Sequence, residues 1–130
     1  MAQPLVPDQE NILRGVFSNE CDEQRGRFSS VFTGGNVSVS RPKLIPLEQH
    51  WDLFRRHVAK PPQRVLMFFL EINVGHLRGL GRDYTDRPIQ IHVREDPLSW
   101  NPAHALIIED LPRGLAKKAI RDSIRHEPPR

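Results

Sequence analysis

Residues 65–74 read Val-Leu-Met-Phe-Phe-Leu-Glu-Ile-Asn-Val, and the first six of them form the most apolar run in the chain. A short continuous apolar run is typical of a strand that is covered on both faces of a sheet. We therefore expect residues 65–72 to form the central strand of the fold. The segments on either side must then supply the neighbouring strands and the helices that cover the sheet.

Three segments follow this run. Residues 75–81 contain three glycines, which predict irregular structure. Residues 89–94 alternate between apolar and polar side chains, as a half-exposed strand does. Residues 105–108, Ala-Leu-Ile-Ile, form a further apolar run and predict another strand.

Three segments precede the run. Residues 9–17 follow Asp8, a suitable N-cap, and carry apolar residues on one side, so they predict a short helix. Residues 18–27 are polar and without period, and they predict a loop. Residues 28–40 contain two β-rich runs around Gly34-Gly35. This pattern predicts a hairpin, because glycine supplies the positive φ angles of tight turns.

Two longer helices are expected, at residues 46–58 and 113–126. In the first, four apolar residues recur with the helical period: Leu47, Trp51, Phe54 and Val58. Pro46 and Pro112 stand where a helix tolerates proline, in its first turn.

The expected elements mix helices and strands without strict alternation. This order favours an α+β fold with a mixed or largely antiparallel sheet and two packed helices. A chain of 130 residues has the length of one domain, so we expect residues 1–130 to form a single compact domain. Most of the 12 prolines lie at element boundaries, and residues 1–8 and 127–130 are expected to be loose ends.

The composition excludes several classes of protein. With 38% hydrophobic and 27% charged residues, the chain is neither collagen-like nor strongly disordered. No apolar run approaches the ~18 residues of a membrane span, so no membrane partner is expected. Cys21 is the only cysteine, which excludes an intrachain disulfide framework and cysteine-based zinc sites. Together with the lack of a secretory signal, this predicts a cytoplasmic protein.

The basic residues gather at the C-terminal end. Residues 111–130 carry six basic and two acidic residues, a net charge of +4, against +3 for the whole chain. Four of the basic residues are spaced by four along the outer face of the expected helix, with Lys118 beside them: Arg113, Lys117, Arg121 and Arg125. This ridge predicts a surface for nucleic-acid phosphates or for an acidic protein partner, the alternative being a solvated helix face.

Two residues are candidates for catalysis. Glu71 directly follows the most apolar run, and burial of a carboxyl group raises its pKa and suits it to acid–base chemistry. His104 belongs to Asn101-Pro-Ala-His-Ala, which predicts a turn that presents the imidazole at the mouth of the next strand. If they converge, the protein is a small enzyme acting on nucleic acid or a nucleotide. The alternatives are that Glu71 marks the exposed end of a strand and that His104 is an ordered structural residue.

A third group of polar residues follows the expected hairpin. Ser38, Ser40 and Arg41, with Arg27, could bind a phosphate or carboxylate, because arginine suits bidentate contacts. The alternative is an ordinary solvated strand face. Ser38 to Ser40 with Glu71 also motivate an ADP-ribosyltransferase-like or small-ligand-binding fold, although the required arginine on an early core strand is not evident. The histidine spacing supports no metal site, and no cofactor is expected.

Two strings resemble a pattern in small uncharacterised bacterial proteins: Ser38-Val-Ser-Arg41, and Asp96-Pro97 followed by Asn101-Pro-Ala-His-Ala105. The resemblance covers about a third of the chain. It implies a bacterial cytosolic setting and a shared structural or ligand role for both strings, and it implies no activity.

The absence of recognised catalytic motifs and the one-sided basic helix favour one hypothesis over the others. The sequence predicts a small cytosolic accessory or interaction module. We expect it to bind a larger protein partner or nucleic acid through its basic C-terminal helix.

Overall fold

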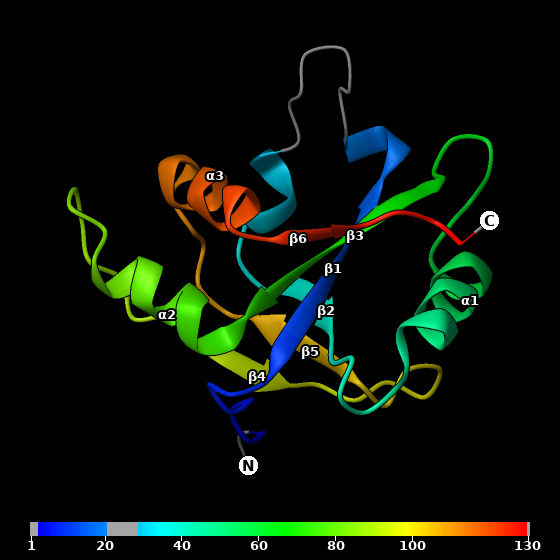
Figure 1. The fold of residues 1–130 in the computed structure, drawn as a ribbon, viewed down its shortest axis with the longest axis horizontal. Helices are drawn as coiled ribbons and strands as arrows, with labels where there is room; N and C mark the ends of the chain where they lie inside the picture. The colour runs from blue at the N-terminus through cyan, green and yellow to red at the C-terminus, as the bar shows by residue number, and fades with distance from the viewer. Residues whose placement is uncertain (1–2, 21–28, 130) are drawn as a thin grey trace.

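A six-stranded sheet with the strand order β4-β5-β2-β1-β3-β6 organises the structure (Figure 1). The structure is a computed structural model that describes residues 3–20 and 29–129. The strands are β1 (Asn11–Phe17), β2 (Val37–Ser40), β3 (Leu66–Asn73), β4 (Val93–Glu95), β5 (His104–Ile107) and β6 (Ile124–His126). Every pairing between them is antiparallel, so the expected α+β class is confirmed.

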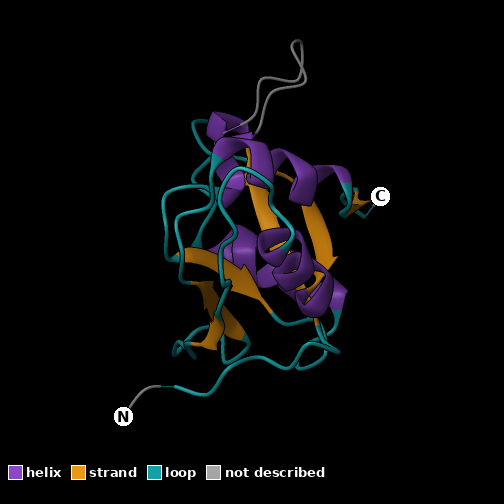
Figure 2. Ribbon diagram, turned by 90° about the vertical axis from the view of Figure 1, so that its left-hand side faces the viewer, coloured by secondary structure: helices purple, strands orange, loops and turns teal. Residues whose placement is uncertain are grey.

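Three α-helices cover the two faces of the sheet: α1 (Leu47–His57), α2 (Val74–Arg82) and α3 (Arg113–Arg121). Two short 3-10 turns are also present, η1 (Ser18–Glu20) and η2 (Ser29–Phe32). Helix α1 packs alone on one face, whereas α2, α3 and η2 pack on the other (Figures 1 and 2). In the described part of the chain, no helix is long and apolar enough to cross a membrane.

The sheet separates two hydrophobic cores. On the α1 face, Leu13 and Phe69 pack against Trp51 and Phe54. The larger core, on the α2 and α3 face, has three further groups of members. From the strands come Ile12, Val16, Phe68, Leu70 and Ile72; from the helices come Leu77, Leu115, Ala116 and Ala119; and from η2 come Val31 and Phe32.

The apolar run at residues 65–72 forms β3, an interior strand as predicted. It pairs with β1 on one side and with β6 on the other. Successive residues of β3 enter different cores, Phe68 one and Phe69 the other, which explains why the run shows no alternation. In the strand order β3 lies off centre, because β1 and β2 occupy the middle.

The predicted helix at residues 9–17 is wrong, because this segment is strand β1. It lies between β2 and β3 and is covered on both faces. Ile12 and Val16 enter the core under α2 and α3, and Leu13 and Phe17 enter the core under α1. Apolar residues on both faces of a strand fall by chance at helical spacing here, and that produced the wrong expectation.

The predicted hairpin at residues 28–40 is wrong in its first strand. Gly34 and Gly35 do have positive φ angles, 101° and 74°, as a turn requires. However, the residues before them form η2, and β2 pairs with β1 and β5 instead. Val31 and Phe32 are fully buried, and the carbonyl of Val31 accepts a hydrogen bond of 2.7 Å from Arg14 Nε, so η2 fills the core rather than extending the sheet.

The glycine-rich segment after β3 is helix α2, not irregular structure. The Asn73 side chain caps it by accepting a hydrogen bond of 2.8 Å from the backbone N–H of His76. A Cβ on Gly81 would lie 2.7 Å from the carbonyl oxygen of Ile89, so this glycine allows the helix to pack closely on the following segment.

The predicted helix at residues 113–126 ends at Arg121, and residues 124–126 form β6 beside β3. Ser123 closes the helix by donating a hydrogen bond of 2.6 Å to the carbonyl of Ala119. The helix predicted at residues 46–58 is confirmed as α1, and the apolar run at 105–108 as β5. Of the strand expected at 89–94, only β4 is regular, and residues 4–6 hydrogen-bond to it through Val6 and Pro4.

Candidate functional sites

The predicted basic ridge is shorter than the sequence suggests. Arg113, Lys117 and Arg121 follow each other along α3 and are exposed. Arg125 does not continue this row, because the helix has ended and β6 directs its guanidinium over the ring of Phe68, 3.7 Å from the ring centroid. The ridge on α3 therefore consists of three residues, with the ammonium of Lys118 beside it over the ring of Tyr84.

Helix α2 adds basic residues that the sequence did not indicate. It lies beside α3 (Figure 1), and a pocket of about 350 Å³ opens between them. The pocket is lined by Gly75, His76, Gly79, Leu80, Arg82, Asp83 and Lys118. We call Arg113, Lys117, Lys118 and Arg121 together with His76 and Arg82 the α2–α3 basic surface.

The carboxylates near this surface neutralise only part of it. Asp122 accepts hydrogen bonds from Arg121 (2.9 Å) and lies 2.8 Å from His76 Nε2. These two partners, Arg121 first, lower the pKa of Asp122 to about 2, so it is a carboxylate at neutral pH. Among the described residues, Arg113 and Lys117 have no carboxylate within ion-pair distance.

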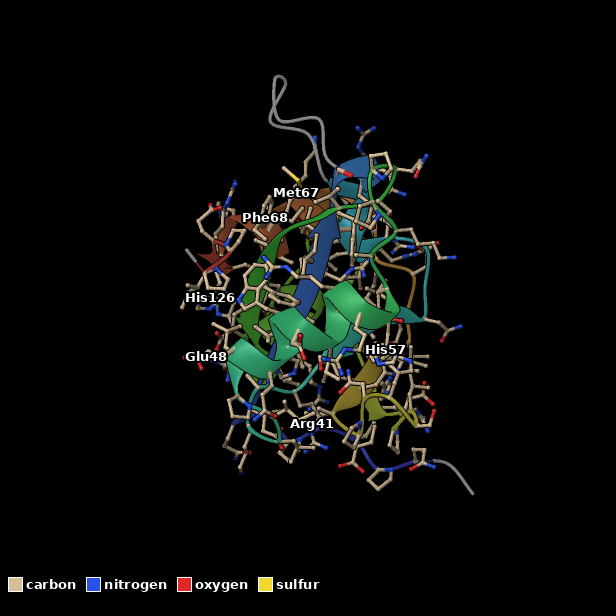
Figure 3. The ribbon with its side chains drawn as sticks, turned by 90° about the vertical axis from the view of Figure 1, so that its right-hand side faces the viewer. Arg41, Glu48, His57, Met67, Phe68 and His126 are labelled. Carbon is tan, nitrogen blue, oxygen red and sulfur yellow. The ribbon has the colours of Figure 1, made fainter. Side chains whose placement is uncertain are left out.

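Glu71 belongs to a polar cluster on three neighbouring strands. Asn11 Nδ2 donates to one of its carboxylate oxygens (2.6 Å), and His126 Nε2 lies 2.7 Å from the other. Asn73 Nδ2 in turn donates to Asn11 Oδ1 (3.3 Å). This cluster attaches the short strand β6 to β3 (Figure 3 labels His126). Glu71 also lines a pocket of about 650 Å³ with Pro7, Gln9, Glu10, Asn11, Pro42 and Lys43.

Glu71 and His104, the two predicted catalytic residues, do not meet. Leu13 pairs with both Glu71 and Ser40, and Ser40 pairs with His104, so these residues form one row across the sheet. Three strand spacings separate the ends of this row, about 14 Å. The partner of His104 is Asp96 instead, whose carbonyl oxygen lies 2.8 Å from its Nδ1, and the His104 side chain is 8% exposed.

The two strings that carry the resemblance lie side by side. Asn101 Nδ2 donates to Ser40 Oγ (3.0 Å), and the backbone N–H of Arg41 donates to the carbonyl of Ala103 (3.0 Å). Ser40 and Asn101 are fully buried, whereas Ser38 is exposed. Arg27, the remaining member of the predicted anion site, lies outside the described residues, as does Cys21.

Arg41 is already engaged by carboxylates within the protein. It donates from Nε (2.9 Å) and Nη2 (2.6 Å) to Glu10, and from Nη1 (2.5 Å) to Glu95. The hydrogen bonds from Arg41 lower the pKa of Glu10, although burial opposes this. An external phosphate would have to displace these carboxylates, so the contacts describe a structural role for Arg41.

Sequence reasoning also missed a chain of aromatic rings around α1. The Phe54 ring contacts Phe69 at 5.0 Å between centroids and Trp100 at 5.9 Å, and Trp100 stacks on His57 at 5.1 Å. Trp100 directly precedes the Asn101 string, and its position along the chain gives no indication of a contact with α1. The nearby His50 is fully buried, and burial lowers its pKa.

No known protein family, curated protein or solved structure matches this chain. Within the residues that the structure describes, no group of three or more His, Cys, Asp or Glu side chains is arranged to hold a metal ion. The resemblance of the two strings to small bacterial proteins stays a prediction.

Proposed function

We propose that this protein is a small accessory module that binds nucleic acid through the α2–α3 basic surface. One observation carries the proposal: Lys118 of α3 and His76 and Arg82 of α2 line one pocket, and α3 also presents the exposed cations Arg113 and Lys117. Gly75 and Gly79 line this pocket and keep it free of bulky side chains. A phosphate backbone lying along the pocket would contact basic groups from both helices.

The character of the surface favours a polyanion over a protein partner. Among the residues that the structure describes, the large exposed apolar ones are Leu5, Leu44, Val65 and Ile124, and none of them belongs to α2 or α3. Stable protein interfaces place apolar or aromatic anchors at their centre. The α2–α3 basic surface offers cations instead, which suits binding to phosphates without sequence preference.

The expected binding is weak and strongly dependent on salt. If about three phosphates are neutralised, the logarithm of the association constant falls against that of the salt concentration with a slope of about −2 to −3. The measurement is fluorescence anisotropy of labelled duplex DNA and duplex RNA across a salt series.

Charge reversal tests the surface directly. We expect Arg113→Glu combined with Lys117→Glu to abolish binding at low salt, whereas Lys43→Glu, an exposed residue that is not part of this surface, leaves it largely unchanged. Equal binding by both variants would contradict the proposal. Binding of the wild type to an acidic peptide but not to either duplex would favour the larger protein partner instead.

The alternative prediction, an enzyme acting on nucleic acid or a nucleotide, has less support. It needs Glu71 and His104 at one substrate, and their separation across the sheet prevents a direct proton transfer between them. Cleavage of nucleic acid by the wild type that is lost in Glu71→Gln and in His104→Ala would support this alternative.

The setting of the proposed module rests on the sequence. The single cysteine supports a cytoplasmic location, where thiols stay reduced. The resemblance of the two strings supports a bacterial source. Both are proposals, and neither is needed for the binding experiments.

A further inference from the structure

A series of ring contacts leads from the core to the surface beside α1. Phe69 is fully buried, Phe54 nearly so, Trp100 is partly exposed, and His57 is exposed. The inner contacts are edge-to-face, with interplanar angles of 79° and 78°. The outermost contact, between Trp100 and His57, is a stack with an interplanar angle of 23°.

The space for this series comes from a missing side chain. Gly15 lies on β1 beneath α1, and a Cβ there would be 3.2 Å from the ring of Phe54. The glycine lets Phe54 settle on the sheet, and Trp100 then packs on the edge of Phe54. Trp100 is thus supported from below by the core.

The loop that carries Trp100 is held firmly. Leu98 and Asn101 exchange two backbone hydrogen bonds of 3.0 Å, which close a tight turn around Ser99 and Trp100. The buried Asn101 side chain donates to Ser40 and accepts from the backbone N–H of Ala103, both at 3.0 Å. Trp100 is therefore a fixed support for His57, and little freedom is lost when a base stacks on the outer face of the His57 ring.

Basic residues flank His57 at the end of α1, and one of them, Arg55, has its guanidinium over the ring of Trp51, 5.4 Å from the centroid. The last turn of α1 carries Arg55 and Arg56, and Lys60 follows it. Asp52 pairs with Arg56 at 2.9 Å, with both side chains about two-thirds exposed. In Figure 3 the labels Glu48 and His57 mark the two opposite ends of α1.

We infer that His57 and Trp100 form a stacking platform for an unpaired nucleobase, with Arg56 and Lys60 available for the flanking phosphates. Aromatic rings beside basic side chains are the combination by which proteins bind single-stranded nucleic acid. A duplex keeps its bases stacked on one another, so the platform selects single strands. The base stacks on the exposed His57 ring and extends the existing pair.

The choice of nucleic acid as the ligand rests on the proposed function, but the stacking platform is a different surface from the α2–α3 basic surface. Helix α1 covers the opposite face of the sheet from α2 and α3. The α2–α3 basic surface binds any phosphate backbone, whereas the stacking platform needs a base that is free of its partner. Variants on one surface therefore leave the other intact.

Tryptophan fluorescence reads the platform directly, because the chain has two tryptophans and only one belongs to it. Trp51 is 3% exposed in the core. We expect single-stranded oligothymidine and oligouridine to quench the tryptophan fluorescence of the Trp51→Phe protein, in which Trp100 is the only tryptophan. The Trp100→Phe protein should show little quenching by the same probes. Comparing the DNA and RNA probes shows whether one sugar is preferred.

The controls separate stacking from charge. An abasic oligonucleotide of the same length keeps the phosphates and should not quench Trp100. We expect His57→Ala to weaken binding of the single strand about tenfold, the effect of losing one stacked base, and to leave duplex binding unchanged. Gln49→Ala, another exposed residue of α1, is the matched control and should change neither.

Three results would overturn the inference: no quenching of Trp100 at saturation, equal quenching by the abasic probe, or wild-type affinity of His57→Ala for single strands. Arg113→Glu with Lys117→Glu tells the two proposals apart. If this variant loses duplex binding while quenching of Trp100 persists, both surfaces act as described. Loss of quenching in this variant would place the single strand on the α2–α3 basic surface and contradict the platform.

Discussion

Arg41 shows how a charged residue contributes when it is buried. Both Arg41 and Glu10 are less than a tenth exposed, and two parallel hydrogen bonds join them. Removing charges from water is costly, and good geometry with paired hydrogen bonds offsets that cost. If one of the two residues is removed, the other is left as an unpaired buried charge, which destabilises the folded protein.

We therefore expect Arg41→Met to lower the free energy of unfolding by about 3–5 kcal/mol, because it leaves the Glu10 carboxylate buried without its cation. Urea denaturation measures this. The control is Arg56→Met, which breaks an ion pair that is about two-thirds exposed and should cost less than about 0.5 kcal/mol. Similar losses in the two variants would contradict a buried role for Arg41.

The Glu10 carboxylate also predicts a dependence on pH. Its hydrogen bonds from Arg41 hold its pKa below the ordinary value of 4.5. A depressed pKa in the folded state stabilises the protein above pH 4.5, and this stabilisation is lost as the pH falls through the folded-state pKa. We expect unfolding free energies measured by urea below pH 4.5 to fall less steeply for Glu10→Gln than for the wild type. The exposed Glu48→Gln should behave as the wild type.

At the scale of elements, the sequence predicted best the segments that are buried on one side only. Helix α1 has one buried side, so its apolar residues kept the helical period and were recognised. Strand β1 is buried on both sides, and its pattern therefore carried no period that separates strand from helix. The strand β6 is only three residues long, too short for a pattern, and the basic spacing of α3 ran on into it.

The candidate sites show the same limit. The spacing of Arg113, Lys117 and Arg121 is local, and the structure keeps it. The contact of Glu71 with His126 joins residues 55 positions apart, and that of Trp100 with His57 depends on where a loop meets a helix. Spacing along the chain does not predict such contacts, because they depend on how distant elements are arranged in the fold.

Two glycines of α2 give a matched test of how this helix packs. A Cβ at Gly81 would lie 2.7 Å from the backbone oxygen of Ile89, which cannot move aside alone. We expect Gly81→Ala to destabilise the protein by about 1–3 kcal/mol. At Gly79 the nearest atom is 3.5 Å away, in the flexible Arg82 side chain, so Gly79→Ala should stabilise by up to about 1 kcal/mol. Thermal and urea denaturation measure both, and destabilisation by Gly79→Ala would contradict this packing.

On the scale of the whole molecule, residues 4–6 cover the edge of β4 and strand β6 covers the edge of β3. Residues 4–6 do this through backbone hydrogen bonds, and β6 does it through antiparallel pairing. An uncovered strand presents unpaired backbone groups to which other chains can bind. Strand β3 is the most apolar segment of the protein, so its pairing with β6 is especially important for preventing self-association.

A chain that ends after Ser123 should therefore be less stable and should self-associate. It lacks His126, the partner of Glu71, and Arg125, which covers Phe68. Size-exclusion chromatography with light scattering measures the association, and urea denaturation the stability. A chain that ends after Glu127 keeps β6 and is the matched control. A monomeric, fully stable shorter chain would show that β6 is dispensable.

The strand order has a consequence for how fast this protein reaches its native state. Asn11 of β1, the first strand in the chain, contacts Glu71, which lies 60 positions later. Glu71 in turn contacts His126, another 55 positions further along. Contacts between such distant positions require large loops to close before they form, which makes folding slower than in proteins whose contacts are mainly local. During synthesis, the edge of β3 stays open until residues 124–126 have emerged. Newly made chains thus pass through a period in which their most apolar strand is open to other chains.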